Sequence, residues 1–226
     1  MLILGLDTSG KSGGVTLAEG DHSRFHVVAS SPIAGGTFSA QLVPTVAALL
    51  STNGYTAHDP EGFAAASGPG SFTGLRVGLS AVKGMAEILQ RPIATVSVLE
   101  ALTFGGGRSG KVAAALDAGR SEIFYGLYVV NDGSATALYE KLLSQVEFHE
   151  RMREDGLELL LTSDAPVADL ASAAGANTEV VERPGSEMIA RIGLRKLLAG
   201  QTVSIEALDA NYLRRSDAEI FFKGNR

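Results

Sequence analysis

Cysteine is absent from this chain of 226 residues. Without a thiol the protein can form no disulfide, hold no metal through thiolates and use no cysteine nucleophile. This composition is consistent with a reducing compartment, in which disulfides are rare.

A basic leader and long hydrophobic runs are also missing. The apolar start, Met1 to Asp7, carries no basic side chain and is too short for a signal peptide. No apolar run approaches the roughly 20 residues of a membrane span. Hydrophobic residues make up 45% of the chain and charged residues 19%, which favours a folded core over disorder. We therefore predict a soluble cytoplasmic protein.

The chain has no excess of positive charge, because its formal net charge is −6. Surfaces that bind nucleic acids are usually basic, since phosphate contacts supply much of their affinity. Basic residues cluster only locally, in the last part of the chain, where Asp217 and Glu219 dilute them. We therefore expect any role on a nucleic acid to go through a partner.

The histidines, Ser71 and the glycines from Gly68 to Gly74 do not form a recognisable hydrolytic or phosphate-transfer site. The chain has four histidines, and none forms an HExxH motif or a close pair on a predicted helix, so we predict no metal site. There is no GxSxG nucleophile elbow, in which the serine lies between a strand and a helix, and Ser71 has no recognisable histidine partner. The glycines from Gly68 to Gly74 do not have Walker spacing, and no lysine follows them at the required position.

The most informative stretch is glycine-rich and runs from Ala66 to Gly78. A short apolar run at 62–66 predicts a buried strand before it. Apolar residues after it recur at the spacing of one helical face: Leu75, Leu79, Val82, Ala86 and Leu89. A strand, a glycine turn and a helix in this order point free backbone N–H groups at an anion. The same residues also turn a chain sharply and let a helix approach its neighbour closely, so both interpretations remain open.

Each half of the chain opens with three predicted strands and continues with a helix, unlike a Rossmann fold, in which a helix follows the first strand. Segment 30–36 is predicted as a loop, Thr37 or Ser39 as a helix cap, 105–110 as a linker, and Ser186 as the cap of the last helix. The predicted strands are 2–6, 13–18, 25–29, 62–66, 92–96, 111–116, 123–130, 135–143, 157–161 and 178–181. The predicted helices are 37–52, one that begins at Phe72, 98–104, 146–153, 166–174 and 186–198.

Asp7 and Asp117 each follow the first strand of one half. Two such carboxylates that face each other across a cleft could hold Mg²⁺ and phosphates. Each could instead tie its own turn through an Asx hydrogen bond. The second interpretation is favoured by the residues alone, because a motif without its structural context is weak evidence.

Two predicted helices carry more apolar surface than one buried stripe requires. In the helix that begins at Phe72, an apolar side that includes Ile88 lies beside a strip of small residues, and the helix at 37–52 is similar. A wider apolar surface indicates a second contact, although deep burial produces the same pattern. The candidate contacts with a partner are Phe38, Leu42, Val43, Val46, Gly74, Val77, Gly78, Ala81 and Met85.

Five segments together resemble one known family: Asp7–Ser9, Ser67–Leu79, Lys83–Ala86, Asp117–Phe124 and Tyr212–Arg214. They look like the TsaB family, also called YeaZ, and the resemblance extends over nearly the whole chain with the segments in the right order. The resemblance implies the α/β fold of the actin, sugar kinase and Hsp70 (ASKHA) superfamily, which is ribonuclease H-like. We therefore expect two lobes, 1–104 and 108–226, each with a mixed sheet that opens β-β-β. The partner-binding helices belong to the first lobe, and the tail of the second could pack back on the first.

The resemblance also implies a function in forming N6-threonylcarbamoyladenosine (t6A) at position 37 of tRNAs that read ANN codons. In the family, TsaD holds the catalytic metal and transfers the threonylcarbamoyl group, whereas TsaB is a non-catalytic scaffold. The expected partners are a TsaD-like protein in a heterodimer, a TsaE-like ATPase, a second copy of the chain when it is alone, and tRNA only through the complex. No cofactor is expected to bind tightly to this chain, and ATP or ADP with Mg²⁺ enters at the level of the complex. The candidate residues for binding a nucleotide or phosphate are Asp7, Thr8, Ser9, Gly68, Gly70, Ser71 and Asp117.

The chain departs from the family pattern at the start of the first helix. Many relatives begin it with a His-Ser-Glu-like sequence, whereas this chain has Phe38-Ser39-Ala40-Gln41. The change removes a potential ligand and adds an apolar ring, which favours the non-catalytic role. Two alternatives remain: a glycoprotease-like hydrolase that uses Ser71 or Asp7, and a small ATPase or kinase of the same fold.

Overall fold

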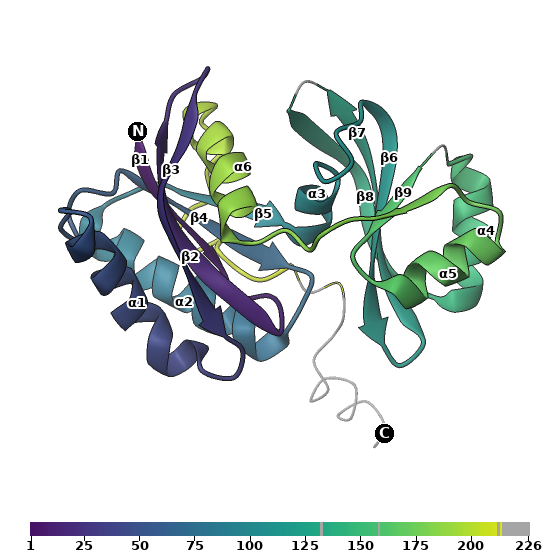
Figure 1. Cartoon of the computed structure of the whole chain (residues 1–226), viewed down its shortest axis with the longest axis horizontal. Helices are drawn as coiled ribbons and strands as arrows, with labels where there is room; N and C mark the ends of the chain where they lie inside the picture. Colours follow the sequence, from purple (N-terminus) through teal and green to yellow (C-terminus); the bar gives the residue numbers. More distant parts are fainter. Residues whose placement is uncertain (132, 158, 212, 214–226) are drawn as a thin grey trace. The chain divides into compact units, whose positions relative to one another are not determined.

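The computed structural model describes residues 1–131, 133–157, 159–211 and 213. The chain divides into two compact units. Unit 1 contains residues 1–101 and 184–210, and unit 2 contains residues 102–183 together with the described residues after Ala210. The elements of both units are drawn in Figure 1.

Unit 1 is built on a five-stranded mixed sheet in the order β3-β2-β1-β4-β5. Its strands are β1 (Leu2–Asp7), β2 (Ser12–Gly20), β3 (Phe25–Ala34), β4 (Gly62–Gly68) and β5 (Ile93–Ser97). The pairs β1–β2 and β2–β3 are antiparallel, whereas β1–β4 and β4–β5 are parallel. Every residue of β1 and β4 is buried, as expected for strands covered on both faces.

Helices cover both faces of this sheet. On one face α1 (Phe38–Thr52) and α2 (Phe72–Leu89) pack against each other and the strands, and α6 (Ser186–Leu198) covers the other face (Figure 1). The short helix α3 (Val98–Leu102) follows β5. Glycines let α6 lie directly on the sheet, because a Cβ added at Gly5 would be 2.5 Å from Ala190 Cβ, and one at Gly193 would be 2.1 Å from Ala64 Cβ.

Unit 2 repeats the plan with a five-stranded mixed sheet in the order β10-β9-β6-β7-β8. Its strands are β6 (Gly110–Gly119), β7 (Glu122–Asn131), β8 (Ser134–Ser144), β9 (Leu160–Thr162) and β10 (Thr178–Val180). Helices α4 (Gln145–Asp155) and α5 (Ala165–Ala173) pack their apolar side chains into one core with β6, β7 and β9. A capping box between Ser144 and Glu147 begins α4.

Two tyrosine hydroxyls share one carboxylate in unit 2. Tyr125 of β7 donates to Asp155 Oδ2 over 2.6 Å, and Tyr139 of β8 donates to the same oxygen. Burial, and then the hydrogen bond to Asp155, raise the pKa of Tyr125 and of Tyr139 above the ordinary value of 10.0. The neutral hydroxyls thereby connect the end of α4 to two strands.

The predicted order of elements is confirmed, since each unit opens with three strands followed by a helix. The loop predicted at 30–36 is wrong for its first five residues, because β3 continues to Ala34 and pairs with β2 as far as Ser12. The helix cap predicted at Ser186 is also wrong. Gly185 is the N-cap of α6, and Ser186 Oγ lies 2.8 Å from Thr16 Oγ1, a contact between elements 170 residues apart in the chain.

The predicted second lobe, 108–226, differs from unit 2 because 184–210 joins unit 1. Lys196 Nζ of α6 donates to Glu100 Oε2 over 2.6 Å and to Thr95 O over 3.0 Å. Val203 N donates to Ile93 O over 2.9 Å. The first boundary falls after Ala101, ahead of the predicted linker at 105–110. The predicted packing of the tail beyond Leu213 falls on residues outside the described ones, as do Tyr212 and Arg214 of the family motif.

Within the described ranges, none of the helices has the length and apolar character needed to cross a membrane.

Candidate functional site

The turn after β1 is stabilised by hydrogen bonds between its own residues. Asp7 Oδ1 accepts hydrogen bonds from Ser9 N over 2.9 Å and from Ser9 Oγ over 2.7 Å. Asp7, Thr8 and Ser9 are 3%, 2% and 1% exposed. This is the Asx turn that the sequence left as one of two interpretations of Asp7.

Helix α2 and the residues just before it pack on this turn through glycines. A Cβ at Gly70 would be 2.2 Å from Ser9 O, one at Gly74 would be 2.0 Å from Thr8 O, and one at Gly78 would be 2.3 Å from Thr8 Oγ1. In addition, Ser71 N donates to Ser9 O over 2.7 Å. The small residues of α2 therefore contact the β1–β2 turn of their own unit.

The start of α2 is stabilised locally. Ser71 Oγ accepts from Gly74 N over 3.2 Å and so caps the helix. Gly68, the last residue of β4, has a φ of 113°, a conformation that glycine adopts without strain. The side chain of Arg76 lies over the ring of Phe72, with 3.9 Å from Cζ to the ring centroid. Ser71 thus stabilises the start of α2, in the glycine-rich stretch that could also have bound a phosphate.

Asp117 occupies the corresponding turn of unit 2 and is exposed. Its Oδ1 accepts from Gly119 N over 2.8 Å, and its own N–H donates to Asp164 Oδ2 over 2.8 Å. Gly119, Arg120 and Ser121 follow with φ values of 71°, 54° and 60°. Asp117 therefore also ties its own turn. The other six predicted phosphate residues lie together in unit 1, whereas Asp117 belongs to unit 2.

The predicted partner contacts on α1 and α2 separate into two groups. Five of them are buried within the chain and pack in its own core: Phe38, Leu42, Val46, Gly74 and Gly78. On α1 the reason is the packing of its inner stripe against β2 and β3. On α2 it is the contact with Thr8 described above.

The other four predicted partner contacts are accessible to solvent. Val43 of α1 is 59% exposed, and Val77, Ala81 and Met85 of α2 are partly exposed. Ile88 is 81% exposed, the highest value among the large apolar side chains of the described residues. The set of predicted contacts omits Ile88, although its helical spacing from Ala81 and Met85 is the signal that places it on the same side of α2.

In the part of the chain that the structure describes, no group of three or more His, Asp or Glu side chains is arranged to hold a metal ion.

Sequence comparison relates the chain to tRNA-modifying proteins. The sequence model of the family described as TsaD, tRNA N6-adenosine threonylcarbamoyltransferase, matches residues 30–190. A "tRNA threonylcarbamoyladenosine biosynthesis protein TsaB" from Escherichia coli is 30% identical, with 79% of this chain and 81% of that protein covered. The protein of the same name from Bacillus subtilis is 28% identical over 97% of this chain and 96% of its own length.

Comparison of structures gives a consistent result. A protein from Pseudomonas aeruginosa, described as uncharacterized with similarity to peptidase YEAZ, superimposes with a TM-score of 0.74 at 25% identity and covers 94% of this chain and 99% of its own. YeaZ from the same organism has a TM-score of 0.72 at 23% identity, with 93% of this chain and all of that chain covered. The predicted fold, ASKHA-like with two mixed-sheet lobes, is confirmed.

Proposed function

This chain belongs to the TsaB/YeaZ family, and from that membership we propose that it serves t6A biosynthesis as a non-catalytic subunit. In this proposal it pairs with a TsaD-like threonylcarbamoyltransferase, and that partner carries the chemistry on the tRNA. The involvement in t6A biosynthesis rests on the relatives, whose names state that role. The pairing and the lack of catalysis are inferred from the surface of unit 1.

The observation that carries the proposal is the exposed apolar surface of α1 and α2. Val43 of α1 is 59% exposed and Ile88 of α2 is 81% exposed. Val77, Ala81 and Met85 of α2 are apolar and partly exposed. Apolar side chains gathered on outward helix faces usually mark a protein interface. Both helices pack against the sheet and against each other, so the surface needs little ordering when a partner binds.

The closed β1–β2 turn supports the non-catalytic part of the proposal. In a phosphate-transfer site, a loop of this kind would present free N–H groups and a free carboxylate to the ligand. Here Asp7 Oδ1 accepts two hydrogen bonds from Ser9, and α2 lies against Thr8, while Gly70 and Ser71 just before it lie against Ser9. We therefore propose that ATP or ADP with Mg²⁺ acts at the level of the complex and is not held tightly by this chain.

Further partners follow from the family resemblance. We propose that a TsaE-like ATPase binds the pair, that tRNA is reached only through the complex, and that the chain forms a homodimer through the same helices when the TsaD-like protein is missing. One surface would then serve two alternative partners, which predicts that the homodimer and the heterodimer exclude each other.

The test is pairing and tRNA modification with purified proteins. The chain with Ala81→Glu should bind a TsaD-like protein at least about tenfold more weakly, because an unpaired carboxylate in an apolar contact costs more than about 1.4 kcal/mol. Ala173→Glu is the matched control, since it makes the same change at an exposed position of α5 in unit 2. Both variants should keep the circular dichroism spectrum and melting temperature of the wild type.

Three results would contradict the proposal. Formation of t6A by this chain without a TsaD-like protein would show that it is catalytic. Peptide hydrolysis that survives repurification and is lost in Asp7→Asn would favour the hydrolase alternative. Equal binding by the wild type and Ala81→Glu would exclude this surface but leave a t6A role through another surface intact.

A further inference from the structure

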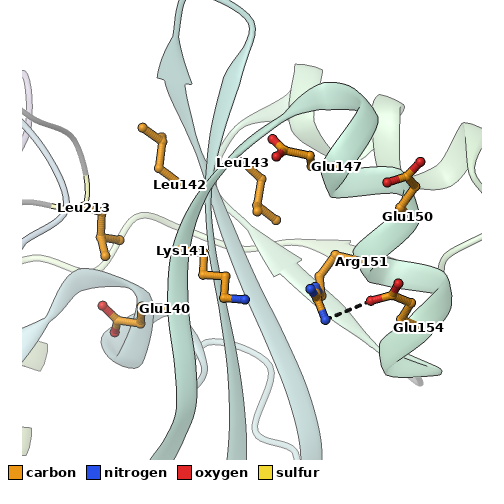
Figure 2. Close-up of a pocket in the computed structure, with 9 residues that line it drawn as sticks. All are labelled: Glu140, Lys141, Leu142, Leu143, Glu147, Glu150, Arg151, Glu154 and Leu213. Atoms are coloured by element: carbon orange, nitrogen blue, oxygen red, sulfur yellow. Dashed lines mark ion pairs between the residues drawn. The ribbon is translucent and has the colours of Figure 1, made fainter. Parts of the chain in front are cut away.

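Unit 2 contains a groove that the proposed function does not use. Figure 2 shows it between β8 and α4, and its volume is about 670 Å³. Four consecutive residues of β8 line it, together with one side of α4 and with Leu213. The lining residues are Glu140, Lys141, Leu142, Leu143, Glu147, Glu150, Arg151, Glu154 and Leu213.

The groove follows the outer edge of a sheet. β8 is the last strand in the order β10-β9-β6-β7-β8, and no described strand pairs with its outer side. Successive side chains of a strand point to opposite faces. Accordingly, Glu140 and Leu142 lie on the side of Leu213, whereas Lys141 and Leu143 lie on the side of α4 (Figure 2). An open edge of this kind can accept an extended peptide.

The lining of the groove is acidic. Its four glutamates outnumber one lysine and one arginine, so the formal charge is −2. Glu147 is used in the capping box of α4, and Glu154 pairs with Arg151 over 2.9 Å. Glu150 is exposed and forms no hydrogen bond or ion pair with the described residues, so its carboxylate is available to a cation.

The chain itself leads into this groove. Asn211 Nδ2 donates to Glu140 Oε2 over 2.6 Å, and Tyr128 donates to the other oxygen of the same carboxylate. Leu213, two residues later, is part of the lining. The sequence then continues with 214–226, whose four basic and two acidic side chains give a formal charge of +2. The same segment contains an apolar run, Ile220-Phe221-Phe222.

We propose that segment 214–226 binds to this groove of its own chain, with one of its basic side chains paired with Glu150. The opposite charges of the groove and the segment favour the contact. Attachment through Leu213 makes the binding intramolecular, and a short tether gives an effective concentration in the millimolar range. A basic peptide of another protein would have to compete with this tethered segment. The proposal does not depend on the function of unit 1.

Hydrogen–deuterium exchange of the full chain tests the proposal. Amides in 140–143 should exchange more slowly in the full chain than in a chain truncated after Leu213, because the bound segment covers the edge of β8. In the full chain, Glu150→Lys should speed exchange there by about twofold to fivefold, the effect expected for one exposed ion pair. Asp169→Lys, an equal charge change at an exposed position of α5 away from the groove, should have no effect.

The Glu150→Lys comparison keeps the test valid even if the truncated chain folds poorly. Equal exchange of 140–143 in the wild type and Glu150→Lys would overturn the proposal. Protection that rises with protein concentration would also overturn it, because a second copy would then be the occupant. Concentration-independent protection that is lost in Glu150→Lys and kept in Asp169→Lys would establish it.

Discussion

Gly74 of α2 offers the sharpest test of how unit 1 is packed. A Cβ at this position would lie 2.0 Å from Thr8 O and 3.3 Å from Thr8 C, whereas ordinary contacts of a Cβ begin near 3.4 Å. The obstacle is backbone, so it cannot move away by a change of rotamer. The β1–β2 turn would have to shift by more than 1 Å, because 2.0 Å is that far below an ordinary contact.

The expected cost of Gly74→Ala can be estimated from three contributions. Overpacking of a tight contact costs about 1–3 kcal/mol. A shift of the turn also weakens the hydrogen bond from Ser71 N to Ser9 O, worth about 0.5–1.5 kcal/mol. Alanine in a helix regains about 0.5–1 kcal/mol relative to glycine. We expect a net loss of about 0.5–4 kcal/mol in the free energy of unfolding, or about 2–4 °C in melting temperature for each kcal/mol.

Gly84→Ala in the same helix is the matched control. A Cβ at Gly84 would meet nothing within 4 Å, so only the helix propensity changes and stability should rise by up to about 1 kcal/mol. Urea denaturation followed by circular dichroism measures both variants. If Gly74→Ala proves as stable as Gly84→Ala, the packing argument is refuted. If it is equally stable and also fails to pair with a TsaD-like protein, Gly74 contacts the partner after all.

Two further predictions concern ionisable groups. Lys196→Met should destabilise the chain by about 3 kcal/mol in urea denaturation, because it removes the ammonium group 2.6 Å from the Glu100 carboxylate, which is only 7% exposed. Adding Glu100→Gln should recover part of that loss. No recovery would show that the charge of Glu100 is not the cause. The raised pKa of Tyr125 predicts that stability is fully present below pH 10 and falls above it, since the tyrosine ionises first in the unfolded chain. The slope attributable to Tyr125 is at most about 1.4 kcal/mol per pH unit. Tyr125→Phe should flatten the fall between pH 10 and 11.5, and an unchanged slope would contradict the assignment.

The order of secondary structure in this protein follows from local sequence. The strands predicted at 2–6 and 62–66 are continuous apolar runs within the observed β1 and β4, and α2 is marked by a stripe of apolar residues. These signals depend on residues close together in the chain, so they can be recognised without knowledge of the fold. The combination of the Asp7, Ser67–Leu79 and Asp117 segments was specific enough to identify the family from sequence.

Contacts between distant segments determine which helix faces are buried, how far β3 extends and which unit α6 joins. The small residues of α2 form a stripe that is equally compatible with a partner and with an internal contact, and only the position of Thr8 shows that Gly74 and Gly78 face inward. Similarly, β3 extends to Ala34 because β2 lies beside it. Helix α6 joins unit 1 because Gly5 and Gly193 leave room for it on the sheet. A helical or strand period reports which residues share a face, but which neighbour covers that face depends on the tertiary fold.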